Sequence, residues 1–275
     1  MTDELTPGDL APIESVVALR PRGPRRRAED RTARPRRRLS VVGVIGELLI
    51  TAGVLVMLFL GWQLWLNNLI VGNQQTAQAV KVSQDWSKNQ STAPAPVTRP
   101  DPGPPVVGTA PANAVQFANL IVPRFGPTWE KPVAEGIGVN DVLDNGVGHY
   151  PGTQMPGDIG NVALAAHRTG WGEPFGDIGN MVIGDHIYVE MEAGWYQYSV
   201  RSFEYVSPTG VGVLDPVPGA DGVKPTDRII TLTSCNPKST AGERIIVYGV
   251  YDTWYPRAGG PPPEIASLVK TAAAG

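Results

Sequence analysis

The stretch "RIITLTSCNPKSTAGERIIVYGVYD", residues 228–252, decides the fold. Its two apolar runs are rich in Ile, Val, Thr and Tyr, which favour β-strands, and a loop of turn-forming residues separates them. We predict that the two runs form an antiparallel pair, in which the end of the first lies beside the start of the second. Opposite residues in such a pair lie roughly 5 Å apart, so Cys235 and Arg244 should meet at the mouth of the loop.

Cys235 is the only cysteine in 275 residues. Strand alternation places Thr231, Thr233 and Cys235 on one face and Ser234 on the other. A single cysteine cannot form an internal disulfide, although cysteines of exported proteins usually occur in pairs. Its place at a strand end beside a loop favours a reactive thiol. The local pattern leaves open a second interpretation, a small buried apolar side chain.

A thiol nucleophile needs a proton-transfer partner, and the chain offers three histidines. His167 ends the strand-like run "NVALAAHR", as Cys235 ends its own, and it ranks first. His186 opens "HIYVEM" on a face that we expect to meet solvent, whereas His149 lies in the turn-like "GVGHYPGT". A zinc site built from these residues is disfavoured because no pair has the short spacing of structural zinc ligands.

The rest of residues 115–255 repeats the pattern of short apolar runs between Gly and Pro turns. Runs of 5 to 10 residues rich in Val, Ile, Tyr and Thr indicate an all-β sandwich or barrel. Helical periodicity over more than about ten residues is hard to find there. One domain of this size is large enough to bury a core of its own.

Residues 41–66, "VVGVIGELLITAGVLVMLFLGWQLWL", form an apolar segment with one formal charge, Glu47. A helix needs roughly 20 apolar residues to cross a bilayer, and Trp62 and Trp65 suit its interface. A cleaved signal peptide has an apolar core of about 7 to 15 residues followed by a small-residue cleavage site. This segment is longer, and its C-terminal end is bulky. We therefore predict a transmembrane helix, with a signal peptide and a buried soluble helix as alternatives.

The charges on either side of this segment predict its orientation. Residues 1–40 carry ten Arg and six Asp or Glu, a net of +4, while the remaining 13 basic and 20 acidic residues give −7. A basic tail can indicate nucleic acid, but here an apolar segment follows at once, so we expect no nucleic-acid partner. The first basic residue after the segment is Lys81. The positive-inside rule places the N-terminus in the cytoplasm and the following domain outside.

Proline marks the connection between the membrane and the β-rich domain. Seven prolines occur among residues 91–111, which favours extended geometry. The sequence therefore predicts five parts: a cytoplasmic Arg-rich tail (1–40), a transmembrane helix (41–66), an extracellular Pro-rich stalk (67–114), a catalytic domain (115–255) and a flexible tail (256–275).

The order of the candidate residues resembles the sortase family. "TLTSC" precedes Arg244 by nine residues, and His167, in "AAHRTG", lies 68 residues upstream of Cys235. The run "GHYPGTQMPGDIGNVALAAHRTG" and the Arg-rich tail before "GELLITAG" resemble class E sortases of high-GC Gram-positive bacteria. The residue before the cysteine is usually Thr, and here it is Ser234, which keeps the hydroxyl but loses the β-branch.

The resemblance implies an eight-stranded β-barrel and a cysteine transpeptidase. Cys235 would attack the Thr carbonyl of a Leu-Ala-x-Thr-Gly-like sorting signal, His167 would transfer protons, and Arg244 would hold the substrate backbone and the oxyanion. The implied partners are surface proteins that carry the signal and an amine of a peptidoglycan precursor or bridge. We expect no cofactor, since no acidic cluster demands calcium. Candidate substrate-binding residues are Tyr150, Thr233 and Ser234.

Other functions stay open at this point. A pilin-polymerising sortase often has an inhibitory lid with an Asp-Pro-aromatic motif, and Asp101–Pro102 lacks the aromatic residue. A membrane-tethered binding domain would carry an inert Cys235. A cysteine peptidase would hydrolyse its substrate without preferring an amine acceptor.

Overall fold

The structure, a computed structural model, describes residues 40–89, 102–238 and 240–273. The Arg-rich tail and part of the proline-rich stretch, residues 1–39 and 90–101, lie outside the described residues. The strands are β1 Gln116–Ile121, β2 Glu130–Glu135, β3 Val147–His149, β4 Gly160–Ala165, β5 His186–Met191, β6 Gly194–Val206, β7 Arg228–Asn236 and β8 Glu243–Pro256. The α-helices are α1 Val41–Gly61, α2 Asn67–Asn89 and α3 Ala266–Ala273; a π-helical turn spans Trp62–Leu66, and 3-10 turns span Pro123–Phe125, Leu143–Asn145, Ile178–Asn180, Val211–Leu214, Arg257–Gly259 and Pro263–Ile265.

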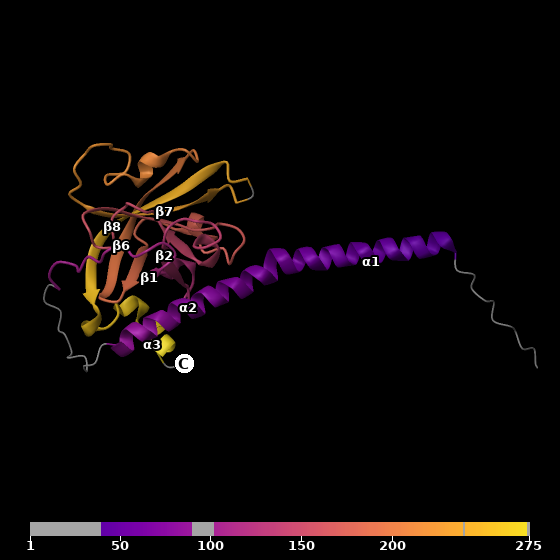
Figure 1. Cartoon of the computed structure of the whole chain (residues 1–275), viewed down its shortest axis with the longest axis horizontal. Coiled ribbons are helices and arrows are strands. Elements are labelled where there is room, and N and C mark those ends of the chain that lie inside the picture. Colours follow the sequence, from indigo (N-terminus) through magenta and orange to yellow (C-terminus); the bar gives the residue numbers. More distant parts are fainter. Residues whose placement is uncertain (1–39, 90–101, 239, 274–275) are drawn as a thin grey trace, which may run out of the picture. The chain divides into compact units, whose positions relative to one another are not determined.

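The eight strands close into one barrel (Figure 1). Their order around the barrel is β1-β2-β3-β4-β7-β8-β6-β5. Neighbouring strands are antiparallel except for the parallel pairs β2–β3 and β4–β7. On β7, Ile230 and Leu232 are completely buried in the apolar core, and Thr231 and Thr233 on the opposite face are buried as well. The predicted all-β fold, an eight-stranded barrel, is therefore confirmed.

The neighbours of β7 determine where the single cysteine lies. In the antiparallel pair with β8, Cys235 lies opposite Arg244, which confirms the pairing expected from sequence. On its other side β7 runs parallel to β4, with Thr233 opposite Ala165. His167 follows Ala165 by two residues, as Cys235 follows Thr233. All three candidate catalytic residues therefore lie at one end of the barrel.

Helix α1 is the one helix of the described residues that is long and apolar enough to cross a membrane, with a mean hydropathy of 2.4. It begins at the predicted residue, Val41, and ends at Gly61. The π-helical turn with Trp62 and Trp65 follows directly, and α2 begins after that turn.

Helix α2 packs against the barrel over residues that the sequence assigned to the stalk. Gln75, Ala79 and Ser83 repeat every four residues, so they share one helix face, and all three are buried. Thr76 donates a hydrogen bond from its hydroxyl to the Glu130 carbonyl at 3.0 Å. This part of the expected stalk is a docked helix instead. Its polar side chains predict an exposed spacer, but they are buried here because they contact polar groups of the barrel.

The C-terminal segment also packs on the barrel, where we expected a flexible tail. Helix α3 lies beside α2 (Figure 1). Just before α3, Ile265 is 2% exposed and packs with Ile121, Tyr188 and Trp195. These contacts bury apolar side chains of the C-terminal segment and of the barrel against one another. Removal of this apolar surface from water favours the packed position of the segment.

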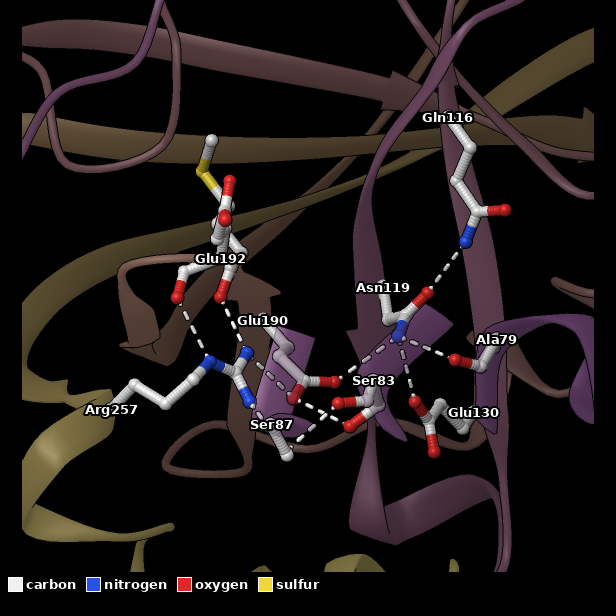
Figure 2. A network of polar contacts seen from close by, with 10 residues as sticks. Ala79, Ser83, Ser87, Gln116, Asn119, Glu130, Glu190, Glu192 and Arg257 are labelled. Atoms are coloured by element: carbon white, nitrogen blue, oxygen red, sulfur yellow. Dashed lines mark hydrogen bonds and ion pairs between the residues drawn. The ribbon is translucent and has the colours of Figure 1, made fainter. Parts of the chain in front are cut away.

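A buried polar network joins α2, the barrel and the C-terminal segment (Figure 2). Asn119 donates to the carboxylates of Glu130 at 3.0 Å and Glu190 at 3.1 Å. Glu190 also accepts from Ser83 of α2 at 2.7 Å and from Arg257 at 2.9 Å. Burial, and then the charge of Glu190, raise the pKa of Glu130 to about 8. Burial therefore favours the protonated, uncharged form of Glu130.

Candidate active site

The thiol of Cys235 lies half-buried near the end of β7. The preceding residue of the same face, Thr233, is 4% exposed. Arg168 donates from Nη1 to the main-chain carbonyl of Cys235 at 3.2 Å and to the side-chain oxygen of Asn236. Arg168 directly follows His167, so this contact ties the end of the histidine segment to the end of the cysteine strand. Sequence reasoning missed Arg168, although it lies within the quoted "AAHRTG".

Arg244 lies half-buried at the start of β8, across the ladder from Cys235. Its Nη1 donates to the carbonyls of Ala241 at 3.0 Å and Glu243 at 2.9 Å. Both acceptors belong to the β7–β8 connection or its edge, so the guanidinium is held at the mouth of that loop. This is the position from which planar N–H donors can face a substrate carbonyl beside the thiol.

His167 has a carboxylate partner that sequence reasoning missed. Its Nε2 lies 3.2 Å from Oδ1 of Asp144, in the 3-10 turn Leu143–Asn145 between β2 and β3. The side chains are 22% and 12% exposed, so the pair is only partly screened by water. A carboxylate acceptor at Nε2 favours a proton on that nitrogen and leaves Nδ1 for proton exchange. No spacing rule connects residues so far apart in sequence, and only the fold brings them together.

Tyr150 and Thr233, two predicted substrate-binding residues, contact one another. Their hydroxyl oxygens lie 3.1 Å apart, and either can donate. Ser234 points the other way: it is 3% exposed and donates from Oγ to the Ala166 carbonyl at 2.8 Å. Because Ala166 directly precedes His167, this hydrogen bond holds β7 against the segment that carries the histidine. We therefore favour this structural role for Ser234 over direct contact with a substrate peptide.

The other two histidines have partners away from the thiol. His149 is completely buried on β3, with Nδ1 2.6 Å from a Glu135 oxygen and Nε2 3.1 Å from the Gln154 carbonyl. His186 is partly exposed, as expected, and its Nδ1 lies 2.5 Å from Glu264. Each imidazole thus has a carboxylate partner of its own, within the barrel for His149 and in the C-terminal segment for His186.

The described residues contain no group of three or more His, Cys, Asp or Glu side chains arranged to hold a metal ion. The chemistry that this end of the barrel can perform with its own groups is that of a thiol, an imidazole paired with a carboxylate, and a guanidinium. Together these groups suit acyl transfer through a thioester.

Comparison with known proteins identifies the family. A family model described as the sortase domain matches residues 120–252. Sortase SrtE1 of Streptomyces coelicolor is 38% identical over 264 residues, which cover 94% of this chain and 68% of that protein. The chain belongs to the sortase family.

Solved sortase structures agree with this assignment. SrtA sortase from Actinomyces oris matches with a TM-score of 0.56 and 38% identity, over 60% of this chain and 94% of that one. Sortase E1 from Streptomyces coelicolor, solved with a tripeptide in the active site, gives 0.52 and 40%, over 57% and 99% of the two chains. This sortase is accordingly a class E cysteine transpeptidase, and its helix α1 is consistent with a membrane anchor.

Proposed function

We propose that this sortase cleaves a Leu-Ala-x-Thr-Gly-like sorting signal between Thr and Gly and joins the Thr carbonyl to a cell-wall amine. The observation that carries the proposal is the register at one end of the barrel. Cys235 lies opposite Arg244 on one side of β7, and the β4 residues that lead to His167 lie on the other side. The three groups needed for thioester chemistry thereby flank a single strand end.

Acylation begins when His167 takes the proton of the Cys235 thiol and the sulfur attacks the Thr carbonyl carbon. Arg244 donates to the oxygen on which negative charge develops. The carbon–nitrogen bond to Gly breaks as His167 gives a proton to the leaving amine. The products are a Thr–Cys235 thioester and the released C-terminal peptide.

Transfer reverses these roles. The acceptor amine attacks the thioester carbonyl while His167 removes one of its protons. The carbon–sulfur bond breaks, the thiol of Cys235 is restored, and a new amide joins the surface protein to the acceptor. Asp144 at Nε2 of His167 fixes the imidazole and stabilises it when it is charged.

The acceptor that we propose is an amine of a peptidoglycan precursor or bridge. The test is intact-mass spectrometry of the detergent-solubilised full chain with a Leu-Ala-x-Thr-Gly peptide, followed by a glycine or diaminopimelate amine. We expect a thioester adduct on the wild type, none on Cys235→Ala, and faster loss of the adduct when the amine is added. An adduct that only water discharges, at the same rate with and without amine, would contradict the transpeptidase assignment of this substrate pair.

We propose that Tyr150 contacts the small Ala of the signal. Its contact with Thr233 at 3.1 Å supports this, because it places the phenol beside the face of β7 that carries Cys235. Tyr150→Ala should reduce the preference for Leu-Ala-x-Thr-Gly over Leu-Pro-x-Thr-Gly, while Tyr150→Phe keeps it. An unchanged preference in Tyr150→Ala would refute the contact.

We propose that the N-terminus is cytoplasmic and the catalytic domain extracellular, from the ten arginines that precede the apolar helix. The single cysteine provides the test. A membrane-impermeant maleimide added to intact cells should label the wild type and leave Cys235→Ala unlabelled. Labelling only after the cells are broken would reverse the orientation.

A further inference from the structure

The loop that follows His167 has an unusual backbone. Four consecutive residues, from Gly170 to Glu173, have positive φ values of 72°, 52°, 78° and 46°. Two of the four, Trp171 and Glu173, are not glycine, and left-handed backbone is unfavourable for them. Such a conformation persists only where neighbouring structure holds it.

This loop begins and ends at the backbone of His167. Eight residues after His167, the N–H of Phe175 donates to the His167 carbonyl at 2.9 Å. The side chain of Phe175 is completely buried in the barrel core, which fixes the far end of the loop. The two ends of the loop are therefore tied to the residue that carries the imidazole.

Helix α2 holds the left-handed part from outside the barrel. Gln75, which is 3% exposed, donates from Nε2 to the Trp171 carbonyl at 2.9 Å. The same nitrogen lies 3.4 Å from the carbonyl of Asp144, whose carboxylate contacts His167. Asn68 of α2 donates to the carboxylate of Glu173. One side chain of α2 thus contacts both segments that meet at the imidazole.

Glycine on both partners lets the helix and the loop approach this closely. A Cβ atom on Gly172 would lie 2.8 Å from the main-chain nitrogen of Gly72, closer than any side chain tolerates against backbone. A Cβ on Gly72 would lie 3.4 Å from the Gly172 carbonyl. Gln75 reaches the loop because these two glycines bring the backbones together.

We propose that Gln75 is a positioning residue for His167: it binds the loop after the histidine and the turn that carries Asp144, and so fixes the imidazole for proton transfer. The proposal rests on the proposed role of His167 as the proton donor to the leaving amine. It also makes the helix that follows the membrane segment a part of the catalytic apparatus, because proton transfer tolerates little error in position.

The leaving group gives a readout that general loss of structure would not imitate. A peptide amine leaves only with a proton, so acylation by an amide depends on the position of His167. A p-nitrophenolate leaves without one, so acylation by a Thr p-nitrophenyl ester depends on Cys235 and Arg244 but little on the imidazole as an acid. Any effect of the imidazole on the thiol enters both rates and cancels in their ratio, so the ratio reports on His167 as the proton donor.

The experiment uses the full chain in detergent, with Cys235 alkylation to count folded active sites. Single-turnover acylation is measured with a Leu-Ala-x-Thr-Gly amide and with the corresponding Leu-Ala-x-Thr p-nitrophenyl ester. For Gln75→Ala we expect roughly tenfold slower acylation by the amide, the effect of about one lost buried hydrogen bond, and an ester rate within about twofold of wild type.

Ser83→Ala is the matched control. Ser83 lies on the same face of α2, is equally buried and donates to Glu190, far along the helix from the loop. It should weaken the docking of α2 without changing the ratio of amide to ester rates. If Gln75→Ala folds poorly, Gln75→Glu keeps its shape and removes the donor, and the same selective loss is expected.

Two outcomes separate failure of this inference from failure of the proposed function. An unchanged amide-to-ester ratio in both Gln75 variants would overturn the positioning role. His167→Ala tests the underlying function: if it also leaves the ratio unchanged, His167 is not the proton donor at all. If His167→Ala abolishes the amide reaction and the Gln75 variants do not change it selectively, only the inference about Gln75 fails.

Discussion

The proton on Glu130 makes the stability of this sortase depend on pH. Glu130 is 1% exposed, and its pKa is raised from 4.5 to about 8, first by burial and then by Glu190. Because the folded-state pKa is the higher one, the folded protein holds a proton that the unfolded chain releases. The stability that Glu130 contributes is fully present below about pH 4.5 and is lost as pH rises toward 8. The loss is about 1.4 kcal/mol per pH unit and at most about 5 kcal/mol in total.

Glu130→Gln keeps the shape of the side chain and the acceptor for Asn119, but it cannot ionise. The free energy of unfolding should therefore fall less steeply with pH in this variant. Between about pH 5 and 8 the difference in slope should approach about 1.4 kcal/mol per pH unit, which corresponds to one proton. Urea unfolding of the detergent-solubilised chain, followed by tryptophan fluorescence at several pH values, measures the slope. Glu204→Gln, on an exposed part of β6, is the control and should leave the slope unchanged. Equal slopes for Glu130→Gln and the wild type would refute the reasoning.

Three further variants test the supports around the site. Asp144→Asn keeps the contact with His167 but removes the charge, and should slow amide acylation roughly tenfold while Cys235 alkylation stays at the wild-type rate. Ser234→Ala leaves the buried Ala166 carbonyl without its donor and should lower the free energy of unfolding by about 1–2 kcal/mol in urea titration, whereas Ser234→Thr keeps the donor and most of that stability. Gly172→Ala, at φ 78° and against the α2 backbone, should lower Tm by several degrees in a thermal scan.

The sequence predicts an all-β domain and the pairing of Cys235 with Arg244 because both depend on local pattern, whereas the choice of a barrel over a sandwich comes from the family resemblance. A connection of only six residues, 237–242, leaves β7 and β8 little choice but to pair. The place of His167 at the end of a strand-like run ranks it first among the histidines, and the family resemblance agrees. The apolar helix α1 is also evident from composition alone, and it begins at the predicted residue.

The docking of α2 and of the C-terminal segment on the barrel could not be predicted from the sequence, because buried polar side chains make these contacts. On β5, Tyr188 and Glu190 share the side of His186 that was expected to meet solvent, and both are fully buried. Glu190 is buried because Ser83 and Arg257, each far away in sequence, hydrogen-bond to it. Pairings of this kind have no periodicity, so the sequence predicts a spacer where α2 lies and a tail where the C-terminal segment lies. Asp144 was missed for the same reason.

The proposed catalytic residues therefore depend on different parts of the fold. Cys235 and Arg244 are placed by the register of β7 and β8, within the barrel itself. His167 is placed by a loop that α2 holds from outside. A fragment that starts at Asn67 keeps α2, and we expect it to acylate with the amide peptide at the rate of the full chain.

A fragment that starts at Pro102 lacks α2, and its His167 loses the contacts from Gln75 and Asn68. It should react with the p-nitrophenyl ester and with an alkylating reagent about as fast as the longer fragment, because the β7–β8 register is intact. Its acylation by the amide should be slower by roughly tenfold or more, since more than one contact is lost. Circular dichroism must show that both fragments are folded. Equal amide rates in two folded fragments would mean that the barrel alone positions the histidine.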